Sequence, residues 1–307
     1  MGAGDDFREF CGRLVIDNRE GLLQRYHLVV RRLNADFRGV DSRTAHSLCT
    51  GSYGRGTAIR GCIDLDMIFC LPDESYERYA SMKPNGQFSL LLDVQASLQK
   101  TFPNARIGAN GQAVVISYPD GVAFEIVPAF LNKDGSYTCP DANLGGSWKT
   151  THPKAEIETI AAMSSQTNGN LKWLCRMMRA WKNLWSVPVG GLQLDTLAYN
   201  FIKDWRYRDK SVLYYDWMCR DFMKYLAERP ERDTMMTVGS GQYIWSQGKF
   251  QHIAARSLKL ADEAIQFSSA GYDGFAQEKW RQVFGVAYPL ETAPAQKKKG
   301  FVCKVTV

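Results

Sequence analysis

A phosphate-binding turn and two carboxylates lie within one short segment of this chain. The segment Gly51–Asp66 begins with Gly51 and Ser52 and ends with Asp64 and Asp66, which are separated by a single residue. A tight turn that opens a helix presents unpaired backbone N–H groups, which bind phosphate oxygens. Residues two apart on a strand share one face, so both carboxylates point the same way. Because Mg²⁺ prefers carboxylate and phosphate oxygens, the segment predicts a site for a nucleoside triphosphate and two divalent metal ions.

A third acid, Glu125, lies within the apolar run Val122–Phe130, which predicts a central strand. Burying a carboxylate among apolar side chains costs free energy unless it is paired or bound to a metal. For Glu125 alone, an ion pair with a neighbouring Arg or Lys is an equal alternative. Together with Asp64 and Asp66, however, Glu125 is predicted to be a metal ligand.

Composition and charge limit the classes of protein that this chain can represent. Its 307 residues are enough for two lobes, and Lys plus Arg outnumber Asp plus Glu by only 38 to 32. That excess suits an anionic small substrate and predicts no dedicated nucleic-acid surface. The eight cysteines lack Cys-x-x-Cys spacing, which indicates reduced thiols. With no signal peptide and no apolar stretch of membrane-spanning length, we expect a soluble, cytoplasmic protein without a membrane partner.

The elements expected to position these acids form an α/β catalytic lobe with a mixed sheet, followed by a helical lobe. A long N-terminal helix is expected over 20–38, with strands over 45–49, 63–71, 113–118 and 122–130, a helix over 88–100 and a loop over 133–149. Beyond Pro153 the pattern is helical almost to Phe284. Its clearest piece is an apolar stripe at helical spacing, which is expected to be core: Leu174, Met177, Met178, Trp181, Leu184 and Trp185. We therefore expect a catalytic core over 1–150, a lobe closing the nucleotide cleft over 151–290 and a flexible basic tail over 291–307.

These motifs resemble those of a known superfamily. Gly51-Ser52, the pair Asp64 and Asp66, and a later single acid are together similar to the polymerase-β-like nucleotidyltransferases. Within them, the segment 51–61 resembles the bacterial cGAS/DncV-like nucleotidyltransferases, the cyclic oligonucleotide synthases of CBASS anti-phage systems. The similarity extends over about 40–210 and includes the runs 124–130, 148–154 and 168–172.

The resemblance implies a two-metal nucleotidyl transfer, in which NTPs are joined with release of pyrophosphate. Asp64, Asp66 and Glu125 would hold two Mg²⁺ ions, and the reaction would run twice to close a cyclic di- or trinucleotide. Such a product activates a separate effector protein. The family also implies regulatory partner proteins, and partners that conjugate the C-terminus.

Two positions depart from the family's pattern. Relatives mostly have Asp where this chain has Glu125, and one extra methylene moves a carboxylate by about an ångström. Activity is expected to survive, with Mn²⁺ as the alternative to Mg²⁺. The second departure is the run Gly191–Asp195, which replaces a Ser-aromatic-His-Leu-Glu run, so a hydroxyl contact to the triphosphate is absent or comes from elsewhere.

The resemblance also implies nucleotide contacts in the second lobe. Lys172 is expected to reach a phosphate, and Ser164 matches the neighbourhood that reads the base, which favours a purine. For Arg179, at helical spacing from Lys172, we expect a solvated basic face instead. Arg55, beside the phosphate turn, is either a substrate contact or half of a surface ion pair.

Two alternatives to a cyclic product stay open. A template-free nucleotidyltransferase that makes linear oligonucleotides or modifies tRNA would share the site, although the modest net charge argues against tRNA. A nucleotide-sensing scaffold of the same fold would require damaged metal ligands, whereas all three acids are present.

Overall fold

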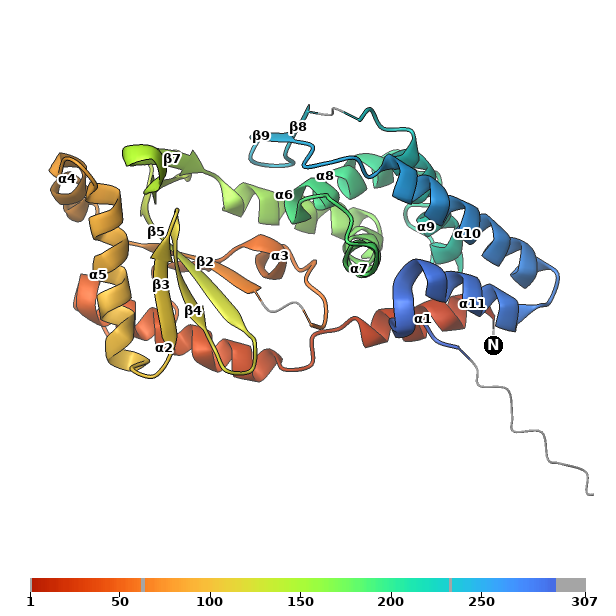
Figure 1. The fold of residues 1–307 in the computed structure, drawn as a ribbon, viewed down its shortest axis with the longest axis horizontal. Helices are drawn as coiled ribbons and strands as arrows, with labels where there is room; N and C mark the ends of the chain where they lie inside the picture. The colour runs from red at the N-terminus through yellow and green to blue at the C-terminus, as the bar shows by residue number, and fades with distance from the viewer. Residues whose placement is uncertain (1, 62–63, 232–233, 291–307) are drawn as a thin grey trace, which may run out of the picture.

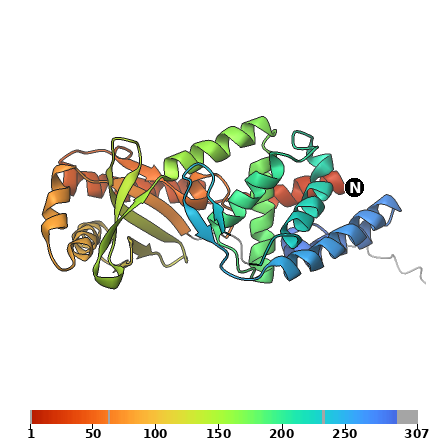
Figure 2. The same cartoon turned by 90° about the horizontal axis from the view of Figure 1, so that it is seen from above.

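The computed structural model describes residues 2–61, 64–231 and 234–290, which form a sheet lobe and a helical lobe lying end to end (Figures 1 and 2). The sheet lobe contains α2 (Arg19–Arg38), β1 (Ser47–Cys49), α3 (Gly51–Gly54), β2 (Asp64–Cys70), α4 (Glu74–Ser81), α5 (Gly86–Thr101), β3 (Arg106–Asn110), β4 (Ala113–Ser117), β5 (Ala123–Leu131), β6 (Tyr137–Asp141) and β7 (Ser147–Thr151). The helical lobe contains α1 (Ala3–Arg13), α6 (Pro153–Gln166), α7 (Asn170–Trp185), α8 (Gly191–Ile202), α9 (Tyr215–Ala227), α10 (Gln251–Ser269), α11 (Asp273–Phe284) and the hairpin of β8 (Thr234–Met236) and β9 (Tyr243–Trp245).

The sheet is mixed, as predicted. Its strands follow the order β1-β2-β5-β4-β3, and β6 and β7 extend it from the far end of β5. The central strands β2 and β5 run parallel, whereas the other pairs in this sheet are antiparallel. The two strands that carry the predicted acids are therefore direct neighbours.

One face of this sheet forms the core of the lobe. Because side chains alternate along a strand, Leu65 and Met67 of β2 and Phe124 and Ile126 of β5 point to the same side, where they are buried. Helices α2 and α5 cover that side and contribute to the same apolar cluster (Figure 1). The opposite face is thus left for Asp64, Asp66 and Glu125.

The predicted N-terminal helix is confirmed as α2, and its ends have clear causes. The Asn18 side chain accepts a hydrogen bond of 3.2 Å from the Gly21 amide, and Gly39 takes the left-handed conformation that ends the helix. One face of α2 is apolar at helical spacing and packs on the sheet. Arg38, in its last turn, donates to the carbonyls of Cys70 and Leu71 at 2.8 Å, which connects α2 to the end of β2.

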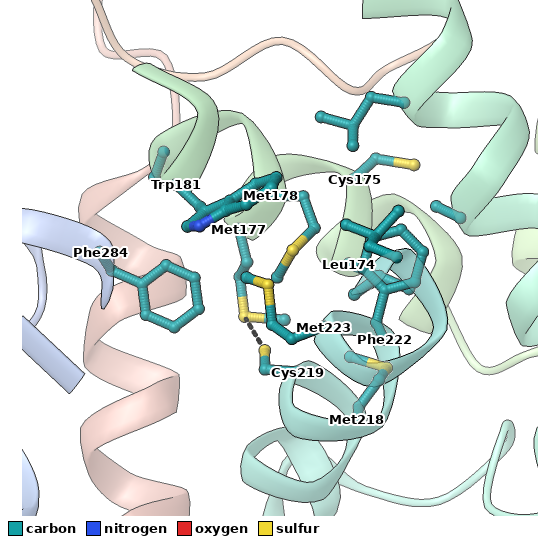
Figure 3. Close-up of a cluster of buried hydrophobic side chains, with 14 of the residues drawn as sticks. Leu174, Cys175, Met177, Met178, Trp181, Met218, Cys219, Phe222, Met223 and Phe284 are labelled. Carbon is teal, nitrogen blue, oxygen red and sulfur yellow. Dashed lines mark hydrogen bonds between the residues drawn. The ribbon is translucent and has the colours of Figure 1, made fainter. Parts of the chain in front are cut away.

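The core of the helical lobe is built on α7. Met177, Met178 and Trp181 of α7 are fully buried, which confirms the expected core role of this stripe. They pack against α9, where the Cys219 thiol lies 3.8 Å from the Met177 sulfur, and against Phe284 of α11 (Figure 3).

Helix α1 packs in this second core, so the lobes do not divide at one point of the sequence. Phe7 and Phe10 are fully buried beside Trp280 and Tyr288, and Figure 1 shows α1 against α11. The chain then crosses to the sheet lobe between α1 and α2. The expected core over 1–150 includes α1, which the structure places with the helices that follow residue 151.

Several elements differ from the sequence-based predictions. The loop expected over 133–149 is wrong, because β6 and β7 pair within it from Tyr137↔Thr151 to Asp141↔Ser147. Pro140 and the glycines of this stretch give it the composition of a loop. Pro140 pairs only with β7, because β5 pairs with β6 at Tyr137 and Thr138, and Pro is tolerated where one side of a strand is open. Strand β3, helix α4 and the hairpin β8–β9 were not predicted, since each is short and lacks a strong apolar period.

Some predictions concern residues outside the described ones. The tail over 291–307, the start of the strand at Ile63, and the thiols of Cys62 and Cys303 fall there. Six cysteines are described, and all six are free thiols, as predicted. No helix among the described residues combines the length and the apolar character needed to cross a membrane.

Candidate active site

Three carboxylates line one cleft on the open face of the sheet. Asp66 of β2 is paired in register with Glu125 of β5, and Asp64 lies two residues before Asp66 on the same face. The cleft has a volume of about 460 Å³, and all three acids contribute to its wall. The structure thus brings together the three acids that the sequence singled out.

Glu125 is more exposed than the sequence predicted. Strand alternation places its apolar neighbours Phe124 and Ile126 in the core on the other face, so its carboxylate reaches the cleft. The charged groups that act on it are Asp66 and Asp64, both acidic. Among the described residues, the ion pair with Arg or Lys that was the alternative for Glu125 does not form.

The phosphate turn lies directly against the acids. Thr50 donates a backbone hydrogen bond of 2.8 Å to the Asp66 carbonyl, which fixes the start of α3 beside β2. Gly51 has φ +57°, and a Cβ at this position would lie 1.6 Å from Oδ2 of Asp66. Only glycine permits so close an approach of the turn to this carboxylate. Gly51 and Ser52 both line the cleft.

Electrostatics in the cleft favours binding of a cation. Burial raises the pKa of the Asp66 carboxyl, Arg55 lowers it, and Asp64 raises it again. Burial raises the pKa of Glu125, with Asp66 and Asp64 adding to the effect. Neighbouring like charges disfavour ionisation, and a divalent cation between them removes that penalty.

The raised pKa of Asp66 predicts a pH-dependent stability in the absence of metal. The folded protein binds this proton more tightly than the unfolded chain does, so the free energy of unfolding falls as pH rises above the ordinary carboxyl pKa of about 4. Asp66→Asn removes the effect. In EDTA, we expect the difference in Tm, variant minus wild type, to become more positive as the pH is raised from about 4 to about 7. A difference in Tm that stays constant with pH would contradict this assignment.

The helical lobe supplies the opposite wall of the cleft. Arg179, Lys182 and Asn183 of α7 line it, together with Gly191 and Leu192 of α8. Lys182 and Asn183 were not predicted as site residues. The available signal was the helical spacing of Lys182 and Asn183, which follow Arg179 by three and four residues on α7.

The expected solvated basic face is wrong for Arg179. Its side chain is buried, and its Nε donates to the Thr57 carbonyl at 2.8 Å while NH2 donates to Asp195 at 2.7 Å. Arg55 is also buried and pairs with Asp195 and Glu156, so the ion pair expected at the surface is internal. Helical spacing alone did not reveal these partners, because Asp195 lies 140 residues from Arg55 in the sequence.

Two other predicted nucleotide contacts lie outside the cleft wall. Lys172 lies beside the phosphate-turn segment, where a Cβ on Gly56 would be 3.3 Å from its Nζ. Ser164 is buried within α6, and its backbone carbonyl accepts from the amide of Gly169 at 2.8 Å. Neither residue is among those that line the cleft with the three acids.

A second hollow adjoins the cleft. It has a volume of about 400 Å³ and shares Gly51, Asp66 and Leu192 with the first. Strand β7 contributes Lys149, Thr150 and Thr151, and the hairpin contributes Gln242. The run 148–154, which carries part of the family resemblance, therefore borders this space.

The three acids form an open row. Among the described residues, no three His, Cys, Asp or Glu side chains form a ready-made metal cluster. Mg²⁺ usually keeps several waters and is bound through one or two carboxylates together with substrate phosphates. An open pair of strands bearing Asp64, Asp66 and Glu125 beside a phosphate turn therefore fits this ion in the presence of nucleotide.

Comparisons with known proteins agree with this geometry. A family model described as the Second Messenger Oligonucleotide or Dinucleotide Synthetase (SMODS) domain matches residues 1–163. A curated Cyclic AMP-AMP-AMP synthase from an Acinetobacter strain is 26% identical over 262 residues, covering 80% of this chain and 73% of that protein.

Solved structures share the fold across both lobes. CdnC from E. coli MS115-1, solved with ATP, has a TM-score of 0.67 at 16% identity and covers 94% of this chain and 99% of its own. Vibrio cholerae DncV cyclic AMP-GMP synthase, solved with the linear intermediate pppA(3′,5′)pG, has a TM-score of 0.67 at 15% identity, with coverages of 91% and 93%. These likenesses establish the fold of this chain.

Proposed function

Because this chain belongs to the SMODS family of bacterial cGAS/DncV-like nucleotidyltransferases, we propose that it joins nucleoside triphosphates into a cyclic oligonucleotide. The observation that carries the proposal is the shared cleft of Gly51, Ser52, Asp64, Asp66 and Glu125. A phosphate turn in contact with a row of carboxylates is the arrangement that nucleotidyl transfer requires.

Asp64 and Asp66 would bind the metal that accompanies the triphosphate, and the same two acids with Glu125 would bind the second. When bound, the two Mg²⁺ ions would neutralise phosphate charge and acidify the attacking hydroxyl. Gly51 and Ser52 would hold the phosphates through the turn, which lies against Asp66.

The transfer itself is an in-line displacement. The ribose hydroxyl oxygen of the acceptor forms a bond to the α-phosphorus, and the bond from that phosphorus to the pyrophosphate oxygen breaks. The hydroxyl proton needs an acceptor, and Glu125, whose raised pKa favours proton uptake, is suited to this role. Catalysis by the chain's own residues consists mainly of positioning and charge balance.

Two adjoining hollows support a reaction between two nucleotides. The cleft and the second hollow meet at Gly51 and Asp66. One hollow would therefore bind the donor nucleotide and the other the acceptor nucleotide. A second transfer within the linear product would close the ring. Lys172 beside Gly56 would then reach a phosphate, and we retain a purine preference as a further proposal.

The biological setting follows as part of the same proposal. We place the enzyme in the cytoplasm of a bacterium, in an anti-phage system where its product activates a separate effector. Free thiols fit a reducing compartment. The related CdnC has been solved as a complex with HORMA-deltaN, which supports a regulatory protein partner for this chain.

Incubation with four labelled NTPs tests the transfer chemistry. With Mg²⁺ or Mn²⁺, we expect pyrophosphate release and labelled products, both lost in EDTA. Release with only linear products would favour the linear synthase instead. No release with either metal would overturn both enzymatic proposals and favour a sensor.

Glu125→Asp tests the third ligand. Shortening the side chain by one methylene restores the acid that relatives mostly carry, so we expect Mg²⁺-dependent turnover to be kept or raised. The ratio of turnover in Mg²⁺ to turnover in Mn²⁺ should increase relative to wild type. If neither the turnover nor this ratio changes, Glu125 is not the third metal ligand.

A further inference from the structure

One buried carboxylate oxygen joins the phosphate-turn segment to the helical lobe. Oδ2 of Asp195, on α8, accepts from Arg55 Nε at 2.9 Å, from Thr57 Oγ1 at 2.9 Å and from Arg179 NH2 at 2.7 Å. Asp195 and Thr57 are fully buried, and both arginines are 6% exposed. Two donors come from the segment that begins at Gly51, and the third comes from α7.

The segment between Ser52 and Thr57 is a closed loop of hydrogen bonds. The amides of Thr57 and Ala58 donate to the Ser52 carbonyl at 2.9 and 3.0 Å, and the amide of Arg55 donates to the Gly51 carbonyl at 3.1 Å. A displacement of Thr57 is therefore transmitted to the phosphate turn. Asp195 fixes one end of this loop, while the Asp66 carbonyl fixes the other through Thr50.

The arginines of this network are oriented by protein groups. Arg179 also donates to both oxygens of Thr57, at 2.8 and 2.9 Å, and Arg55 reaches Glu156 Oε2 at 3.3 Å. Glu156 in turn accepts from Ser240 at 2.7 Å. Two guanidinium groups thus face two carboxylates in a water-poor region, where such pairs require close geometry to offset their desolvation.

A purely structural role would be served by apolar packing at lower cost. Replacing a buried ion network with apolar side chains is often neutral or stabilising, so its stability alone does not explain this arrangement. What the network adds is a fixed relation between the phosphate turn, which lies on the sheet side, and α7 and α8, which line the opposite wall of the cleft. Figure 1 shows α3 at this junction of the two lobes.

We infer that Asp195 is a positioning residue, which acts through Thr57 to hold the phosphate turn at its distance from the acids of β2. This inference rests on the proposed nucleotidyl transfer. Misplacement of a bound phosphate by a fraction of an ångström raises the free energy of the transition state more than it raises that of the bound substrate. Loss of the Asp195–Thr57 bond should therefore lower kcat more than it raises KM.

A matched pair of variants at Thr57 separates positioning from folding. Thr57→Val keeps the volume but removes the hydroxyl, whereas Thr57→Ser keeps the hydroxyl and loses a buried methyl group. We expect Thr57→Val to lower kcat about five- to tenfold with KM for NTP changed by less than about threefold. Thr57→Ser should keep kcat within about twofold although its Tm falls.

Asp195→Asn should give the larger loss of kcat, at least about tenfold, because the charge that holds both arginines is removed. Asp221→Asn is the control in the same lobe, since Asp221 binds Trp205 at 3.0 Å and lies outside the cleft wall. It should lower Tm without a comparable change in kcat. A kcat that follows Tm across the four variants, or equal kcat in the two Thr57 variants, would overturn the inference.

Hydrogen exchange decides the inference even if the chain makes no product. In Thr57→Val and Asp195→Asn, the amides of Thr57 and Ala58 should exchange at least about tenfold faster than in wild type, while those of β2 keep their protection. Unchanged exchange at Thr57 and Ala58 would overturn the positioning role. Failure of the proposed function would appear separately, as a wild-type protein without pyrophosphate release.

Discussion

Replacing Asp64 and Asp66 together by Asn is expected to abolish product formation. Both carboxylates line the cleft on the same face of β2, and each would help to hold the metal ions that neutralise charge at the triphosphate. Removing metal ligands of this kind costs several kcal/mol of transition-state stabilisation, so we expect a loss of at least about 10³-fold in kcat/KM. Pyrophosphate release at saturating Mg²⁺ measures the effect.

The fold should survive this change. Burial and Asp64 both raise the pKa of Asp66, so the double variant relieves a repulsion in the metal-free protein. Asp41→Asn with Asp120→Asn is the matched control, because it removes two carboxylates that pair with Arg31 and Arg25 outside the cleft. Activity retained in the cleft variant at the level of this control would rule out the metal assignment.

Gly51→Ala is expected to have the second largest effect. The new Cβ would lie 1.6 Å from Oδ2 and 2.6 Å from Cγ of Asp66, so either the phosphate turn or the carboxylate must move. A misplacement of about 1 Å at a reacting centre costs about 10²-fold in rate. We therefore expect kcat/KM to fall by at least about that factor.

Gly39→Ala provides the matched control for this variant. Gly39 has φ +64°, close to that of Gly51, but a Cβ there would meet no atom within 4 Å. Both variants bear the cost of the left-handed backbone, which is about 1 kcal/mol for a non-glycine residue. Only Gly51→Ala should lose activity, and equal kcat/KM in the two variants would show that contact with Asp66 is irrelevant to catalysis.

The acids could be predicted from the sequence because their placement depends on local periods. Asp64 and Asp66 share a face by strand alternation, and a single acid within an apolar run identified Glu125. The exposure of Glu125 was predicted wrongly, since a run that looks uniformly apolar in sequence still alternates between two faces. The parallel register Asp66↔Glu125 depends on long-range pairing, which no local period encodes.

The helical wall of the cleft could be predicted only in part. The apolar stripe of α7 predicted its core face, but the same period assigned Arg179 to solvent. Its burial depends on Thr57 and Asp195, which reach it only when α8 and the phosphate-turn segment fold against α7. Asp195 itself lies in the run Gly191–Asp195, and the departure of this run from the family's pattern was the available signal.

The expected loop over 133–149 shows how composition misleads when strands are short. The Ser136 amide donates to the Asp134 side chain at 2.9 Å in a turn, and the chain then returns as β6, which pairs with β5 and with β7. Pairing of β6 with β7 supplies hydrogen bonds that the sequence does not indicate. Part of the wall of the second hollow is therefore formed by a segment whose composition predicts a loop.

The mass of the phosphatase-treated product tests the central proposal most directly. After incubation with all four NTPs and Mg²⁺, a cyclic product has no terminal phosphate and survives phosphatase with one phosphate for each nucleoside. The proposed synthase predicts this stoichiometry in a di- or trinucleotide, absent from the Asp64→Asn with Asp66→Asn variant. A product with one phosphate fewer than its nucleosides would be linear and would contradict the cyclic synthase.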